Sequence, residues 1–165
     1  MFDTIAGLPL HPLVVHATEV IVPTAALVIA LAAVWPLFRR WAGFLPFGLG
    51  LAAMVLVPIS TQSGEALQER VKDTALISTH ADLAEGLLPW IFVLFVVSGV
   101  LLWWNRAERT GTSPRASKFV PIVMAVTAVL AAAGTTGQAV LIGHSGATAV
   151  WSQAATSTGA PVAAQ

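Results

Sequence analysis

The chain has 165 residues, of which 56% are apolar and only 10% are charged. A soluble domain of this length needs more charge to cover its surface, so the composition indicates a membrane protein. Eight basic residues balance eight acidic ones, which leaves no basic field to attract a nucleic acid, and the absence of cysteine excludes disulfides, cysteine-held iron–sulfur clusters and covalently attached c-type haem.

Four stretches are long and apolar enough to cross a membrane as helices, because a spanning helix needs about 20 apolar residues. They cover about residues 13–38, 43–60, 86–104 and 119–142. The sequence therefore predicts an all-α integral membrane four-helix bundle in a single domain over residues 1–151. The tail over residues 152–165 has no helical periodicity, and we expect it to be mobile. No segment recurs visibly, so we expect no internal repeat.

The distribution of basic residues predicts the orientation, because lysine and arginine stay on the cytoplasmic side during insertion. Six cations fall between spans one and two or between spans three and four: Arg39, Arg40, Arg106, Arg109, Arg115 and Lys118. The loop between spans two and three is mainly acidic, and the N-terminus carries Asp3 with no cation. The chain is thus predicted to be a multi-pass protein of the cell membrane with both termini extracytoplasmic.

The segment between spans two and three is expected to form a short surface helix over residues 64–79. Leu67, Val71 and Ala75 recur there at helical spacing. Thr79, followed three residues later by Asp82, predicts a helix N-cap, with the third span continuing from it.

All four histidines fall at the extracytoplasmic ends of the predicted spans: His11, His16, His80 and His144. Glu19 follows His16 by three residues and so shares its helical face. A carboxylate inside a membrane is costly unless it has a partner. We therefore expect His16 to be an interior ligand and Glu19 to be paired with it.

Imidazoles from two helices of a bundle can hold haem iron from both sides. Spans two and four supply the small residues that a flat macrocycle needs around it, although such residues usually only let helices approach one another closely. We predict a haem b that serves electron transfer, with His16 and His80 as the first pair and His11 and His144 as second choices. A single metal ion held by His16, His80 and Glu19 is an alternative. A protein without a cofactor, whose histidines only bond loop carbonyls or headgroup water, is another.

The sequence contains no hydrolase or nucleotide-binding motif that would support those classes of function. It leaves open whether the protein is an enzyme. The smooth, small-residue surfaces of spans two and four also suit a non-catalytic accessory subunit of a larger respiratory or transport complex, or a homo-oligomer, in the lipid bilayer. Proton or ion passage by Glu19 and His16 ranks last, because the inner halves of spans one and three offer almost no polar groups.

Several short motifs resemble those of the bacterial membrane-protein family known as domain of unknown function 2231. The segment from His11 to His16 matches the HPxxxH opening of that family, its most specific piece. Further matching segments are Ser63–Gly64, Thr79–Ala81 and Gly143–Val150. The chain departs from the family pattern at Ala17-Thr18, where the family usually has Phe-Pro, and its closing motif is only approximated. The resemblance covers about residues 7–151 and implies a four-span architecture, with no established reaction.

Overall fold

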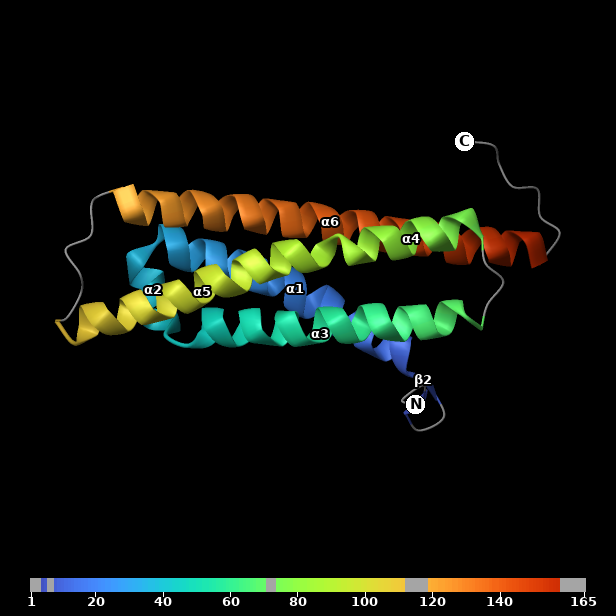
Figure 1. Ribbon diagram of the computed structural model, residues 1–165, viewed down its shortest axis with the longest axis horizontal. Helices are drawn as coiled ribbons and strands as arrows, with labels where there is room; N and C mark the ends of the chain where they lie inside the picture. The colour runs from blue at the N-terminus through green and yellow to red at the C-terminus, as the bar shows by residue number, and fades with distance from the viewer. Residues whose placement is uncertain (1–3, 6–7, 71–73, 112–118, 158–165) are drawn as a thin grey trace.

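A computed structural model describes the chain outside residues 1–3, 6–7, 71–73, 112–118 and 158–165. Its helices are α1 (Leu10–Val34), α2 (Pro36–Ala42), α3 (Leu45–Gln68), α4 (Ala75–Glu85), α5 (Leu87–Arg109) and α6 (Phe119–Ser157). Two-residue strands β1 (Thr4–Ile5) and β2 (Leu8–Pro9) pair antiparallel before α1, and they are the only strands among the described residues. The prediction of an all-helical membrane architecture is confirmed (Figure 1).

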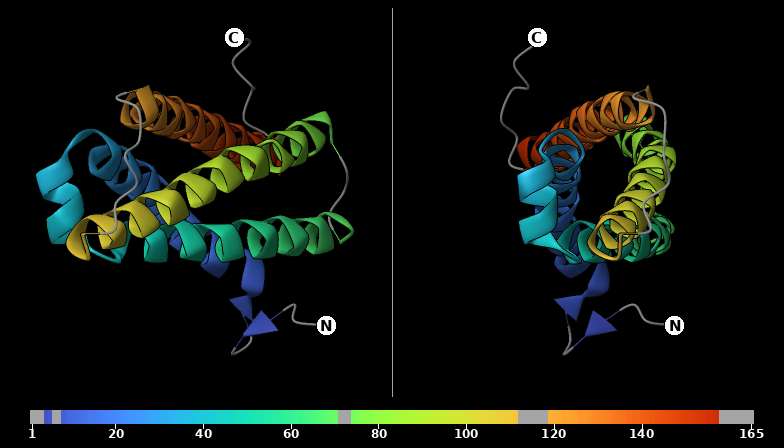
Figure 2. Two further views of the ribbon diagram at one scale, coloured as in Figure 1. Left: turned by 60° about the vertical axis from the view of Figure 1, so that its left-hand side comes forward. Right: turned by 90° about the vertical axis from the view of Figure 1, so that its left-hand side faces the viewer.

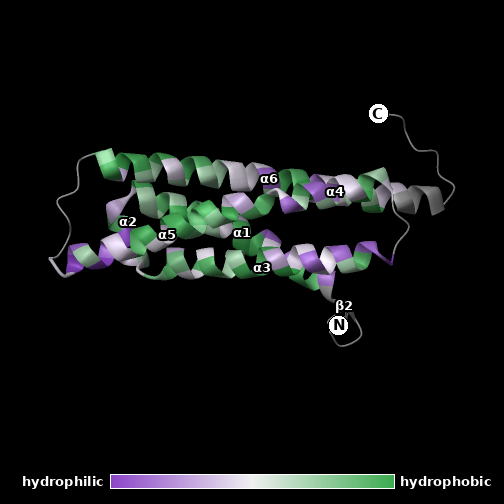
Figure 3. Ribbon diagram, in the orientation of Figure 1, coloured by the Kyte–Doolittle hydropathy of each residue, from purple (hydrophilic) through white to green (hydrophobic). Residues whose placement is uncertain are grey.

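Four helical segments are long and apolar enough to cross a membrane, in agreement with the four predicted spans. They are His11–Val34, Leu45–Gln68, Ala75–Arg109 and Phe119–Ser152. Colouring by hydropathy shows apolar residues through the middle of the bundle and hydrophilic residues gathered towards its two ends (Figure 3). This banding matches a bilayer, whose core excludes unpaired polar groups.

The first predicted span divides at its end instead of running on to residue 38. Trp35 has extended backbone, and Pro36 begins α2 at the first helical position, where its missing N–H costs no hydrogen bond. Gly43 then turns the chain into α3 with a φ of 57°, a conformation that a residue with a side chain adopts rarely.

The predicted surface helix over residues 64–79 is wrong. Its first part continues α3 to Gln68, and its last part belongs to α4, which begins at Ala75. The cap is Thr74 and not Thr79: the Thr74 hydroxyl accepts a hydrogen bond from the Ile77 N–H at 3.4 Å.

The tail was expected to start at residue 152, but α6 continues through residues 152–157. The rest of that expected tail, residues 158–165, lies outside the described part of the chain.

Helices α1 and α5 cross between α3 and α6, which lie on opposite flanks of the bundle (Figures 1 and 2). Each of the two crossing helices packs against both flanking helices. The core is narrow and made of small and branched apolar side chains, including Val22, Ile29 and Ile91, all at most 1% exposed. Most side chains outside this core are apolar as well, as lipid contact requires.

The two halves of the bundle repeat one arrangement, contrary to the expectation of no repeat. Helices α1 and α4 begin at the same end of the bundle, and each half returns through its flanking helix, α3 or α6 (Figure 1). Buried positions recur at an interval of 69 residues: Val22 and Ile91, Ala25 and Leu94, and Ile29 and Ser98. The repeat is not visible in the sequence because it preserves burial at several positions and few residue identities.

Candidate site at the histidine end of the bundle

His11, the second residue of α1, is held by the far end of α3. Its Nδ1 lies 3.2 Å from the Ser60 carbonyl oxygen and 3.1 Å from the Ser63 hydroxyl. The ring rests against Gly64, where an added Cβ would come within 3.0 Å of His11 Cε1. This approach is tighter than nine in ten real Cβ contacts, so the imidazole ring would have to shift by a few tenths of an ångström to accept a side chain there.

His80 of α4 is held by α6 in the same way. Its Nδ1 lies 3.1 Å from the Ile142 carbonyl oxygen and 3.0 Å from the Ser145 hydroxyl. A Cβ at Gly146 would come within 3.1 Å of His80 Cε1. Both histidines therefore rest in a cradle built from a carbonyl, a serine three positions later and the glycine that follows it.

The hydrogen bonds of each cradle determine the tautomer of its histidine. A carbonyl oxygen only accepts, and each serine hydroxyl already donates to that same carbonyl at 2.9 Å. Nδ1 must therefore carry a proton and donate it to the cradle. In the neutral ring this leaves the Nε2 lone pair free, and no described residue forms a hydrogen bond with Nε2 of either histidine.

The two imidazoles lie at the same end of the bundle, where α1 and α4 begin, and both are half-buried there. Each lies within range of the other's electrostatic field. We call His11 and His80 the histidine pair. They occupy equivalent positions in the two halves, separated by the same 69-residue interval as the buried core positions.

His16 and Glu19 lie elsewhere, on the outside of α1. Both are exposed, whereas the core side of the helix carries Val22 and Ala25. The Nδ1 of His16 bonds to the Pro12 carbonyl of its own helix, and Glu19 has no hydrogen-bond or ion-pair partner among the described residues. The expected interior position of His16 is thus not the one observed, since the two residues face away from the helices that α1 packs against.

His144 is exposed on α6, and its carbonyl accepts a hydrogen bond from the Thr148 hydroxyl at 2.9 Å. Of the four histidines, His11 and His80 are half-buried at one end of the bundle, whereas His16 and His144 are exposed. Within the described ranges, no three His, Asp or Glu side chains gather in a way that could hold a metal ion.

The cradle residues received no role from the sequence alone. Ser63-Gly64 and Ser145-Gly146 lie in segments that match the family pattern, but their contact with a histidine is visible only in the structure. One pattern in the sequence could have pointed to these residues. Ser63-Gly64 follows the second span and Ser145-Gly146 follows the fourth, and in each case the span before it begins near a histidine.

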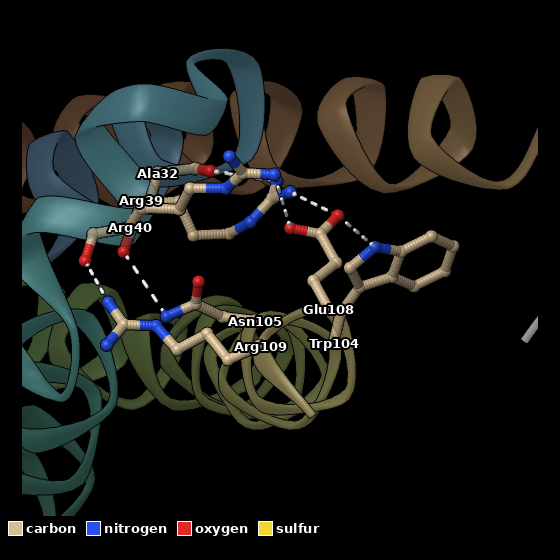
Figure 4. A network of polar contacts seen from close by, with 7 residues as sticks. All are labelled: Ala32, Arg39, Arg40, Trp104, Asn105, Glu108 and Arg109. Atoms are coloured by element: carbon tan, nitrogen blue, oxygen red, sulfur yellow. Dashed lines mark hydrogen bonds and ion pairs between the residues drawn. The ribbon is translucent and has the colours of Figure 1, made fainter. Parts of the chain in front are cut away.

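The opposite end of the bundle is closed by an ion-pair network (Figure 4). Arg39 of α2 is only 9% exposed, and its Nη2 donates a hydrogen bond to Glu108 Oε1 of α5 at 3.2 Å. Trp104 Nε1 donates to the same oxygen at 2.7 Å. Asn105 and Arg109 reach back to the carbonyls of Arg39 and its neighbour Arg40. These bonds attach α2 to α5 and fix the end that carries the cations.

Comparison with known proteins assigns the chain to a family. A family model described as a predicted membrane protein, domain of unknown function 2231, matches residues 7–159. No curated protein and no solved structure matches the chain.

Proposed function

Because the chain belongs to the DUF2231 family of predicted membrane proteins, we propose that it is a multi-pass membrane protein that holds haem b between His11 and His80 for electron transfer. One observation carries the proposal. Each imidazole is fixed by a hydrogen-bonded Nδ1 and keeps its Nε2 available, which is the arrangement of a histidine prepared to bind iron.

The donor set fits a haem better than a lone metal ion. A structural zinc site needs four protein ligands, and a catalytic one needs three. The described residues supply two imidazoles here and no third ligand, since Glu19 faces outward. A haem needs only two axial ligands from the protein, because the porphyrin provides the other four.

The cradles would also tune the ligands. A hydrogen bond from Nδ1 to a carbonyl raises the basicity of Nε2 and fixes the plane of the ring. Gly64 and Gly146 leave each ring seated on the helix backbone, with no side chain to push it away. Bound haem would supply one-electron redox chemistry.

The orientation follows from the opposite end of the bundle. The cations of α2 and of the end of α5, Arg39, Arg40, Arg106 and Arg109, lie far from the histidine pair. By the positive-inside rule that end is cytoplasmic, so the haem site and both termini are extracytoplasmic. An electron carrier on that side would exchange electrons with an extracytoplasmic or membrane-bound partner.

An optical spectrum tests the proposal. Protein purified in detergent from cells with sufficient haem should show a Soret band that shifts on reduction. The variants His11→Ala and His80→Ala should each lose the band of the native form, whereas His144→Ala, the control, should keep it. A colourless, fully folded wild-type protein would remove the haem proposal. Stable copurification of that colourless protein with a larger respiratory or transport complex would instead support the accessory-subunit function.

A further inference from the structure

The outer face of α1 carries the Glu19 carboxyl group and the Nε2 atom of His16, neither of which bonds to a described residue of the chain. We define this face by five exposed residues spaced along one side of the helix: Pro12, His16, Glu19, Val20 and Leu27. His16 and Glu19 lie within the membrane-spanning part of α1, which begins at His11. Polar side chains on the lipid side of a span are rare because lipid offers them no partner.

The polar groups of this face are complementary to those of a second, identical face. His16 is exposed and uses Nδ1 to donate to the Pro12 carbonyl, so its Nε2 remains available to a group outside the bundle. Glu19, one helical turn further along, offers a carboxyl group with no partner among the described residues. One proton between His16 Nε2 and a carboxylate would satisfy both groups.

We propose that this face is the interface of a symmetric dimer, in which His16 of each copy bonds to Glu19 of the other. A twofold axis along the membrane normal places two identical helix faces together and forms the bond twice. Both copies keep the same orientation in the membrane, so α1 runs parallel to its equivalent. Val20 and Leu27, 64% and 60% exposed, pack along the same contact.

The occupant is a second copy because donor and acceptor sit on one face, one turn apart. A different protein would need to supply both a carboxylate and an imidazole at matching depths, whereas a second copy supplies them by symmetry. The proposal is independent of the haem site, which lies at the end of the bundle and uses neither residue.

Disulfide trapping tests the dimer, because the chain contains no cysteine. Val20→Cys should cross-link to a second copy when the protein is oxidised in vesicles at a low protein-to-lipid ratio. Leu130→Cys on α6 is the matched control, since residue 130 is 63% exposed and likewise faces outward. It should cross-link only at the rate of random collision. Equal cross-linking of the two variants would overturn the proposal.

The bonding is tested in the Val20→Cys background. Glu19→Gln and His16→Ala should each lower the cross-linked fraction, by about tenfold if both symmetric bonds are lost. Exchanging the two residues, His16→Glu with Glu19→His, should restore it. Failure of the exchange to restore cross-linking, or cross-linking in native membranes only to a different protein, would contradict the dimer. The haem spectrum should be the same in all these variants, which separates this test from the optical one.

Discussion

At the scale of single residues, the position of each imidazole in the histidine pair depends on a glycine beside it, which has no β-carbon. Gly64 and Gly146 matter because a β-carbon there would press on the imidazole ring at 3.0 or 3.1 Å. Such a contact would move the ring away from its carbonyl and serine partners and so turn Nε2 out of position.

We therefore predict that Gly146→Ala lowers the haem content of the purified protein by several-fold while the protein stays folded. Gly143→Ala, three positions away on the same helix, is the control, since a Cβ at Gly143 meets nothing within 4 Å. The haem-to-protein ratio gives the readout. Unchanged haem content in Gly146→Ala would mean that the cradle does not position His80.

At the scale of elements, the contact between α5 and α6 includes one close approach. Trp90 of α5 lies across Gly134 of α6, where a Cβ would come within 2.6 Å of the indole ring. We predict that Gly134→Ala forces the two helices apart and lowers the free energy of unfolding by about 1–3 kcal/mol, the usual cost of overpacking. Gly137→Ala, with nothing within 4 Å, should have little effect. Unfolding in a titration with denaturing detergent measures both, and equal stabilities would contradict the packing.

The ion pair between α2 and α5 gives a second prediction at this scale. Glu108→Gln should destabilise the protein by about 3 kcal/mol, because it leaves the buried Arg39 guanidinium without its counter-charge. Arg40→Gln should cost little, because Arg40 is 63% exposed and lies 3.6 Å from Glu108. The same detergent titration distinguishes them, and a larger loss in Arg40→Gln would show that the exposed arginine is the main partner.

At the scale of the whole molecule, the sequence predicts the apolar spans that the bilayer requires. It predicts little of how the helices pack against one another. Four spans follow from length and hydropathy alone, and the structure confirms them. The inward side of each span does not follow, because a helix in lipid is apolar on both faces and its periodicity carries no direction. This is why His16 was expected inside the bundle and His11 was a second choice.

The repeat was also beyond the sequence, because it preserves positions more than residue types. Ile29 and Ser98 are equally buried, although one is apolar and the other polar. His11 and His80 hold equivalent positions in the two halves, and their cradles are equivalent as well. The two histidines should therefore contribute alike to any bound group.

Electron paramagnetic resonance of the oxidised, haem-loaded protein tests whether His11 and His80 are the two axial ligands. Two imidazoles give ferric haem a low-spin signal, and removing either should convert it to high spin. We predict the low-spin signal in the wild-type protein and in His144→Ala, and the same high-spin signal in His11→Ala and His80→Ala. A low-spin signal that survives in both of these variants would show that neither histidine is an axial ligand.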